Sequence, residues 1–199
     1  MRPYYWIMRI GAHVRDSADP IGSAESLGVD FVQMFLTDPQ KWNKLQPHPQ
    51  GEELKASDID VVVHSSYVLN VASLNNRIRI PSRKAVIEQA AAAAEIGAIG
   101  LVVHGGHVRD GEDTAKGFEN WRKLFERQVG EGGFGVPIFI ENTAGGDFAM
   151  ARHFDDIARL WVLPRPLPCL GRWRGVGRCG RSHQGHHRSN RPCAPEQFT

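Results

Sequence analysis

The sequence predicts an α/β protein with a parallel sheet, and three observations support this fold class. Short apolar runs alternate five times with stretches of helical periodicity over residues 1–161, as successive βα units do. Histidine or glutamate follows four of these runs, and functional groups collect at the carboxyl ends of parallel strands. A hydrophobic content of 41% and a charged content of 23% are ordinary for a globular chain. These observations leave both a doubly wound sheet and a barrel open.

The expected strands are the short apolar runs. Runs rich in β-branched residues and bounded by polar positions are typical of buried parallel strands. In chain order they are 8–12 (MRIGA), 30–35 (DFVQMF), 60–63 (DVVV), 100–103 (GLVV) and 136–140 (VPIFI).

The expected helices lie between and after these runs. The segment 81–96 is the strongest, because Pro81 is tolerated in a first turn and an alanine-rich stretch follows it. The other helices are expected at 20–27, 51–56, 113–129 and 148–161.

Residues 162–199 differ sharply in composition from the rest of the chain. They hold seven arginines, no lysine and one acid, for a net charge of +6, which leaves −4 for residues 1–161. All three cysteines lie here, and the stretch from Cys179 to Cys193 also contains three histidines, but the spacing matches no zinc-finger pattern. No apolar periodicity is visible, so we expect a boundary near residue 162 followed by a disordered tail.

Polar side chains stand at four predicted strand ends. His13, His64, His104 and Glu141 each follow an apolar run, and His107 comes soon after the fourth run. Two imidazoles and a carboxylate that converge on one face form a candidate zinc or manganese site. A glutamate that bridges two metal ions suits phosphodiester hydrolysis. An isomerase with one divalent metal uses the same ligand types, so these residues alone do not choose the reaction.

Four motifs carry a resemblance to a known family. GAHV, VVVHSSYVLNVAS, VVHGGHV and ENTAGG occur in order over residues 8–161, which resemble endonuclease IV, a zinc-dependent family of xylose-isomerase-like TIM barrels. The resemblance implies about the first five βα units of an incomplete TIM barrel. It also implies a site for three zinc ions, with Mn²⁺ as an alternative, and cleavage of DNA 5′ to abasic sites in base-excision repair.

The resemblance implies a role for each motif residue. His64, His104 and Glu141 would be metal ligands, and Glu141 would bridge two ions and act in catalysis by orienting the attacking water. The loop after the third strand would insert an aromatic or apolar wedge into the DNA at the lesion. The DNA-binding residues would be His13, Gln40, Tyr67, Val68 and His107.

The resemblance stops at Trp161, before the family's next motif of the form LDxCH. Read one base forward from Leu163, the permitted codons can spell CLDPCHAWAGG, which restores that motif. We therefore hypothesise that 162–199 is out-of-frame translation and that the domain over 8–161 is C-terminally truncated. By the same resemblance Met8 is the expected initiator, which makes 1–7 an N-terminal extension.

Three functions compete: an abasic-site endonuclease, a sugar isomerase or epimerase of the same barrel group, and an inactive truncated product. The DNA-inserting loop favours the first, although three ligand residues are too few for a three-metal cluster, so little or no cleavage is expected. The expected partner is double-stranded DNA. Its phosphates would lie opposite local cations such as Lys41, Arg77 and Arg83. We expect a cytoplasmic monomer with no membrane span, and no nucleotide cofactor, because NTAGG lacks a Walker lysine.

Sequencing the gene across the Trp161 codon tests the frameshift hypothesis. The codons from Leu163 onward are expected to spell CLDPCH in the shifted frame, because that motif follows in the family. The codon assignment of residues 150–161, which lies before the join, serves as the in-frame control. Codons that cannot spell this motif would refute the hypothesis.

Overall fold

The computed structural model describes residues 10–15, 17–143, 145–146 and 148–161. The expected extension over 1–7 and the expected tail over 162–199 lie outside these residues. Within the described part of the chain, no helix combines the length and the apolar character that a membrane span requires.

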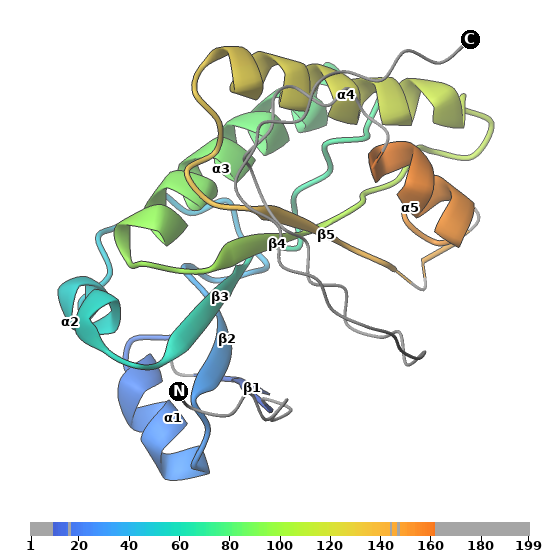
Figure 1. The fold of residues 1–199 in the computed structure, drawn as a ribbon. Helices are drawn as coiled ribbons and strands as arrows, with labels where there is room; N and C mark the ends of the chain where they lie inside the picture. Colours follow the sequence, from blue (N-terminus) through green and yellow to red (C-terminus); the bar gives the residue numbers. More distant parts are fainter. Residues whose placement is uncertain (1–9, 16, 144, 147, 162–199) are drawn as a thin grey trace, which may run out of the picture.

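Five parallel strands form a single sheet whose spatial order follows the chain, β1-β2-β3-β4-β5 (Figure 1). A doubly wound sheet reverses its strand order at a switch point, whereas a barrel adds each strand beside the previous one. The sequential order therefore selects the barrel, and the predicted run of five βα units of a TIM barrel is confirmed. The strands are β1 (Ala12–His13), β2 (Phe31–Phe35), β3 (Asp60–His64), β4 (Gly100–His104) and β5 (Ile138–Glu141).

Helices α1 to α4 follow one another along one side of the sheet (Figure 1). The side chain of Asp19 accepts a hydrogen bond from the Gly22 N–H at the start of α1, and Gly28, with a φ of 65°, ends the helix in the left-handed conformation. The predicted bounds of the first two helices are confirmed. The helices are α1 (Pro20–Leu27), α2 (Gly51–Ala56), α3 (Asn76–Glu95), α4 (Thr114–Gly130) and α5 (Phe154–Trp161).

The predicted start of the third helix at residue 81 is wrong. Helix α3 begins at Asn76, because the Asn75 side chain caps it by accepting a hydrogen bond from the Arg77 N–H at 2.9 Å. Pro81 consequently lies inside the helix, where it leaves the carbonyl of residue 77 without its usual N–H donor. The cap signal in Asn75 therefore outweighs the proline as a marker of the helix start.

The predicted start of the fifth helix at residue 148 is also wrong. Residues 148–150 instead hold the loop after β4 with their backbone groups: the Val108 N–H donates to the Phe148 carbonyl at 3.1 Å and the Met150 N–H donates to the Gly106 carbonyl at 2.9 Å. Because these backbone groups bond to another loop, they are not available for helical hydrogen bonds, and α5 begins only at Phe154.

The core lies between the sheet and the helices. Valine, methionine and leucine side chains on β2, β3 and β4 pack against small and aromatic side chains of α3 and α4. The sheet side contributes Val32, Met34, Val63, Leu101 and Val103, and the helix side contributes Val86, Ala90, Ala93, Trp121 and Leu124.

Trp121 joins this core to the loop after β4. Its ring is completely buried, and its Nε1–H donates a hydrogen bond of 2.8 Å to the carbonyl of Gly105, the residue after His104. The most buried side chain of α4 therefore also fixes the backbone that follows one of the predicted site residues.

Replacing Trp121 by phenylalanine tests this link. The Trp121→Phe variant keeps an aromatic ring but leaves the buried Gly105 carbonyl without its donor, so the free energy of unfolding is expected to fall by about 1–3 kcal/mol. Urea denaturation followed by far-UV circular dichroism measures the change. Trp42→Phe is the matched control: that ring is 52% exposed, and a change of no more than about 0.5 kcal/mol is expected. Equal losses in the two variants would contradict the assignment.

Candidate metal centre

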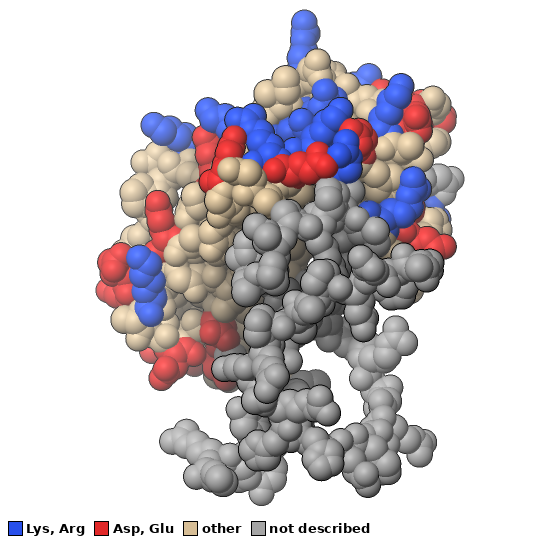
Figure 2. All heavy atoms as spheres, turned by 45° about the horizontal axis from the view of Figure 1, so that its top comes forward, with Lys and Arg blue, Asp and Glu red and all other residues tan. Residues whose placement is uncertain are grey.

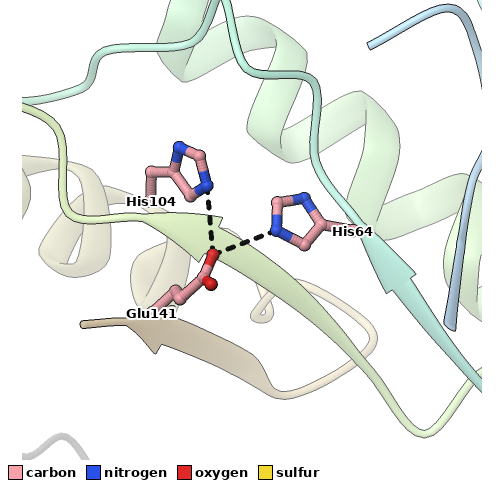
Figure 3. Close-up of side chains that lie close together, drawn as sticks. All are labelled: His64, His104 and Glu141. Carbon is pink, nitrogen blue, oxygen red and sulfur yellow. Dashed lines mark hydrogen bonds and ion pairs between the residues drawn. The ribbon is translucent and has the colours of Figure 1, made fainter. Parts of the chain in front are cut away.

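The three predicted metal ligands lie at the carboxyl ends of three adjacent strands (Figure 3). His64 is the last residue of β3, His104 the last of β4 and Glu141 the last of β5. In the β4–β5 ladder His104 stands opposite Glu141, and in the β3–β4 ladder His64 stands opposite Val102, two residues before His104. Side chains two apart in a strand share a face, so all three point to the same side of the sheet.

The carboxylate of Glu141 lies between the two imidazoles. Its Oε2 atom is 3.0 Å from Nε2 of His64 and 3.0 Å from Nε2 of His104 (Figure 3). One potential ligand atom from each residue falls within a group whose members all lie within 4.8 Å of one another, and it is the single such group of three among the described residues. His64 is buried, His104 is partly buried and Glu141 is more open, so the site faces outward on its glutamate side.

The position of the ring hydrogen on His64 favours a cation between His64 and Glu141. Its Nδ1 lies 2.8 Å from the backbone carbonyl of Ser65, and because a carbonyl can only accept, Nδ1 carries the hydrogen. The Nε2 lone pair of the neutral ring then faces a carboxylate oxygen at 3.0 Å, an arrangement of two acceptors that needs a proton or a metal ion between them. A backbone bond to the far ring nitrogen is also how metal-binding histidines are commonly oriented.

Burial favours the neutral form of His104. It lowers the pKa of the imidazole below its usual value; the Glu141 carboxylate opposes this shift, and the nearby His64 reinforces it. The neutral imidazole is the form that coordinates a metal ion. Two imidazoles and one carboxylate match the nitrogen and oxygen donors that zinc accepts, so the residues present fit a zinc ion.

An aromatic cluster covers the histidines. The Tyr67 ring stacks on His104 with a centroid distance of 5.4 Å and an interplanar angle of 20°. The Phe35 ring makes edge contacts with His13 at 4.9 Å, with His64 at 5.1 Å and with Tyr67 at 5.1 Å. Sequence reasoning missed Phe35, although its place as the last residue of an expected strand beside a site was a usable signal.

A backbone hydrogen bond joins the loops after β2 and β3, which carry predicted DNA-binding residues. The Tyr67 N–H donates to the Pro39 carbonyl at 2.8 Å, which joins the loop of Gln40 to the loop of Tyr67. Gln40 is exposed and Tyr67 is 50% exposed, whereas Val68 is only partly exposed and packs against the core. The loop thus presents the tyrosine to solvent and turns the valine inward.

His13 and His107 are exposed and lie outside the group of three ligands. His13 follows Ala12 in β1 and its Nδ1 lies 3.0 Å from the side-chain oxygen of Gln33. His107 is held by Asn70, whose side-chain amide accepts from the His107 N–H at 3.1 Å and donates to its carbonyl at 2.9 Å. Sequence reasoning did not single out Asn70, although it lies within the quoted motif VVVHSSYVLNVAS.

Comparison with known proteins agrees with the barrel fold. Residues 21–162 match the model of the xylose isomerase-like TIM barrel family, and the chain belongs to that family. Two curated relatives, both named Probable endonuclease 4, come from Mycobacterium tuberculosis (strain ATCC 25177 / H37Ra), at 53% identity, and Mycobacterium leprae (strain Br4923), at 50%. Each match spans 154 residues, 77% of this chain and 59% of the relative. The resemblance to endonuclease IV that the motifs predicted is therefore confirmed.

Solved structures give the same fold. Endonuclease IV from Thermus thermophilus is 25% identical with a TM-score of 0.61, over 77% of this chain and 58% of that one. A D-tagatose 3-epimerase-like protein reaches the same TM-score of 0.61 at 17% identity, over 77% of this chain and 60% of that one. The second likeness concerns the fold alone. The chain spans about 59% of the length of the curated relatives it matches.

Metal titration tests the three ligands. Glu141→Gln and His104→Ala are each expected to weaken zinc binding at this site by more than about tenfold, because even the outer partners of metal ligands contribute 10- to 100-fold. Competition with a chromogenic chelator measures the affinity. His153→Ala, which removes an exposed histidine outside the group, is the matched control, and His107→Ala is expected to behave like it. Loss of zinc in His107→Ala but not in His104→Ala would overturn the ligand set.

Proposed function

We propose that this chain is part of a zinc-dependent deoxyribonuclease of base-excision repair, which cleaves the phosphodiester 5′ to abasic sites in double-stranded DNA. The observation that carries the proposal is the group of His64, His104 and Glu141, with an exposed tyrosine stacked on one of its histidines. Identity of 53% to a protein named Probable endonuclease 4 supports the same reaction.

In this proposal His64, His104 and Glu141 hold the metal. A bound zinc ion would supply a nucleophilic hydroxide at neutral pH and would stabilise the charge on the phosphodiester oxygens. His64 is oriented for this by its bond to the Ser65 carbonyl, and burial keeps His104 neutral. Glu141 is the catalytic candidate, because its carboxylate reaches both imidazoles and is also the most open of the three side chains. Its second oxygen would accept a hydrogen bond from the attacking water.

The surrounding loops are proposed to bind the DNA around the lesion. Tyr67 is the candidate wedge residue, because its ring is half exposed directly above a metal ligand. Val68 would support the wedge from its partly buried position, and Gln40 would meet the DNA from the loop that the Pro39 carbonyl joins to Tyr67. His13 at the end of β1 and His107 in the loop after β4 are exposed and would line the flanks.

The proposal names zinc rather than manganese because two imidazoles outnumber the single carboxylate, and nitrogen ligands favour zinc over harder, oxygen-preferring ions. It also includes a monomer that works in the cytoplasm. The absence of a carboxylate-rich ligand set among the described residues supports the choice of metal.

Binding to damaged DNA tests the proposal. The zinc-loaded chain is expected to bind a labelled duplex with a tetrahydrofuran abasic analogue more tightly than the same duplex without it, as measured by fluorescence anisotropy. Tyr67→Ala is expected to reduce this preference by about 1–3 kcal/mol, the usual contribution of an aromatic ring stacked on a base. Phe154→Ala removes an aromatic ring that is 88% exposed elsewhere and is the matched control.

The same samples report the reaction. A denaturing gel detects nicking 5′ to the lesion, which is expected to be slow, because the described ligands are fewer than a three-metal cluster requires, and to stop on addition of a chelator. A ketose panel is incubated in parallel and is expected to stay unconverted. Equal affinity for the damaged and undamaged duplexes, or metal-dependent ketose conversion, would refute the proposed function.

A further inference from the structure

Helices α3 and α4 carry many of the positive charges of the molecule. Figure 2 shows Lys and Arg side chains gathered on the face that these two helices form. Two of them, Arg79 and Arg83, stand one turn apart on α3, and both side chains are partly buried. Like charges at this spacing repel each other, so the pair destabilises the helix unless an anion neutralises it.

The carboxylates of this face are already engaged by other cations. On α4, Arg122 pairs with Glu119 and with Glu126, and Arg127 pairs with Glu131, which follows the helix, at 2.8 Å. On α3, Lys84 pairs with Glu88 at 3.6 Å. In the described part of the chain neither Arg79 nor Arg83 forms an ion pair with a carboxylate.

The partners that Arg79 and Arg83 do have are neutral. Arg79 Nη1 donates to the carbonyls of Ser73 at 2.9 Å and Leu74 at 3.0 Å. Arg83 Nη2 donates to the carbonyl of Asn120 at 2.5 Å. The Nε atoms of both arginines are buried and have no hydrogen-bond partner among the residues that the structure describes. These contacts position the two guanidinium groups without neutralising their charges.

The electrostatics point in the same direction. Burial lowers the pKa of Arg83, and the charges of Arg79 and Arg127 lower it further. A guanidinium group stays protonated at neutral pH even so, and both arginines therefore keep their positive charge. Planar guanidinium groups recognise phosphate oxygens through paired hydrogen bonds.

We propose that the Arg79–Arg83 pair of α3 forms a binding site for a phosphate group. The phosphate can come from the free inorganic ion or from a nucleic-acid backbone, and the chemistry of recognition is the same for both. The site uses none of the three metal ligands, so it can be tested in metal-free protein.

Two titrations of the metal-free chain, at constant ionic strength with chloride as the balancing ion, test this site. In the first, inorganic phosphate is added, and a saturable rise in the thermal unfolding midpoint is expected. In the second, an undamaged duplex is added, and binding is measured by fluorescence anisotropy. Arg79→Gln and Arg83→Lys are expected to weaken at least one of the two affinities by about tenfold, since the first removes a positive charge and the second removes a planar guanidinium group.

Lys84→Gln is the matched control, because it removes one charge from a neighbouring position of the same helix whose side chain is 77% exposed. Far-UV circular dichroism confirms that each variant folds, and Arg79→Gln decides the matter if Arg83→Lys does not. A tenfold loss for phosphate alone assigns the site to the free anion, and a loss for the duplex alone assigns it to a nucleic-acid backbone. No saturable binding in either titration, or equal losses in Lys84→Gln and Arg79→Gln, would overturn the proposal.

Discussion

The register of the β3–β4–β5 ladder is the constraint on which the candidate centre depends. It sets His104 opposite Glu141 and places His64 two positions lower along the neighbouring strand, so all three side chains project from one face. A shift of one residue between β4 and its neighbours would turn His104 toward the helices. The buried valines of β3 and β4 and the buried leucine of β4 resist such a shift, because it would turn their side chains away from the core beneath the helices. The same strand register therefore satisfies both the hydrophobic core and the geometry of the candidate ligands.

The charges of the three side chains determine which ion the candidate centre can hold. One carboxylate lies between two imidazoles, and His64 is committed to donating through Nδ1 to a backbone carbonyl. Burial works against a proton on His104, so protonating both histidines to neutralise the contact is costly. A divalent cation satisfies the carboxylate and both lone pairs together without adding a proton to either ring.

Much of this arrangement could be predicted from the sequence, because local patterns encode it. The β-branched runs identified β2 to β5 to within two residues, and the histidine or glutamate that follows a run marked His64, His104 and Glu141 as neighbours. The two errors in helix starts have different causes. A local cap at Asn75 begins α3 before Pro81, whereas residues 148–150 form long-range hydrogen bonds with the loop after β4 instead of a helix. A strand end marks Phe35 and a motif contains Asn70, but the contacts that define their roles come from distant parts of the chain and do not follow from local pattern.

The loop after β3 shows how the outer helices act on the centre. Its far end is held from outside the barrel: the Asn120 side chain donates to the carbonyls of Ala72 and Ser73, and Arg79 donates to those of Ser73 and Leu74. Its near end carries Tyr67, whose ring rests on His104. Because the backbone between these points is short, the helices limit where the tyrosine can lie above the ligands. Arg79 is thus connected, through backbone carbonyls, to the loop whose tyrosine covers the candidate metal site.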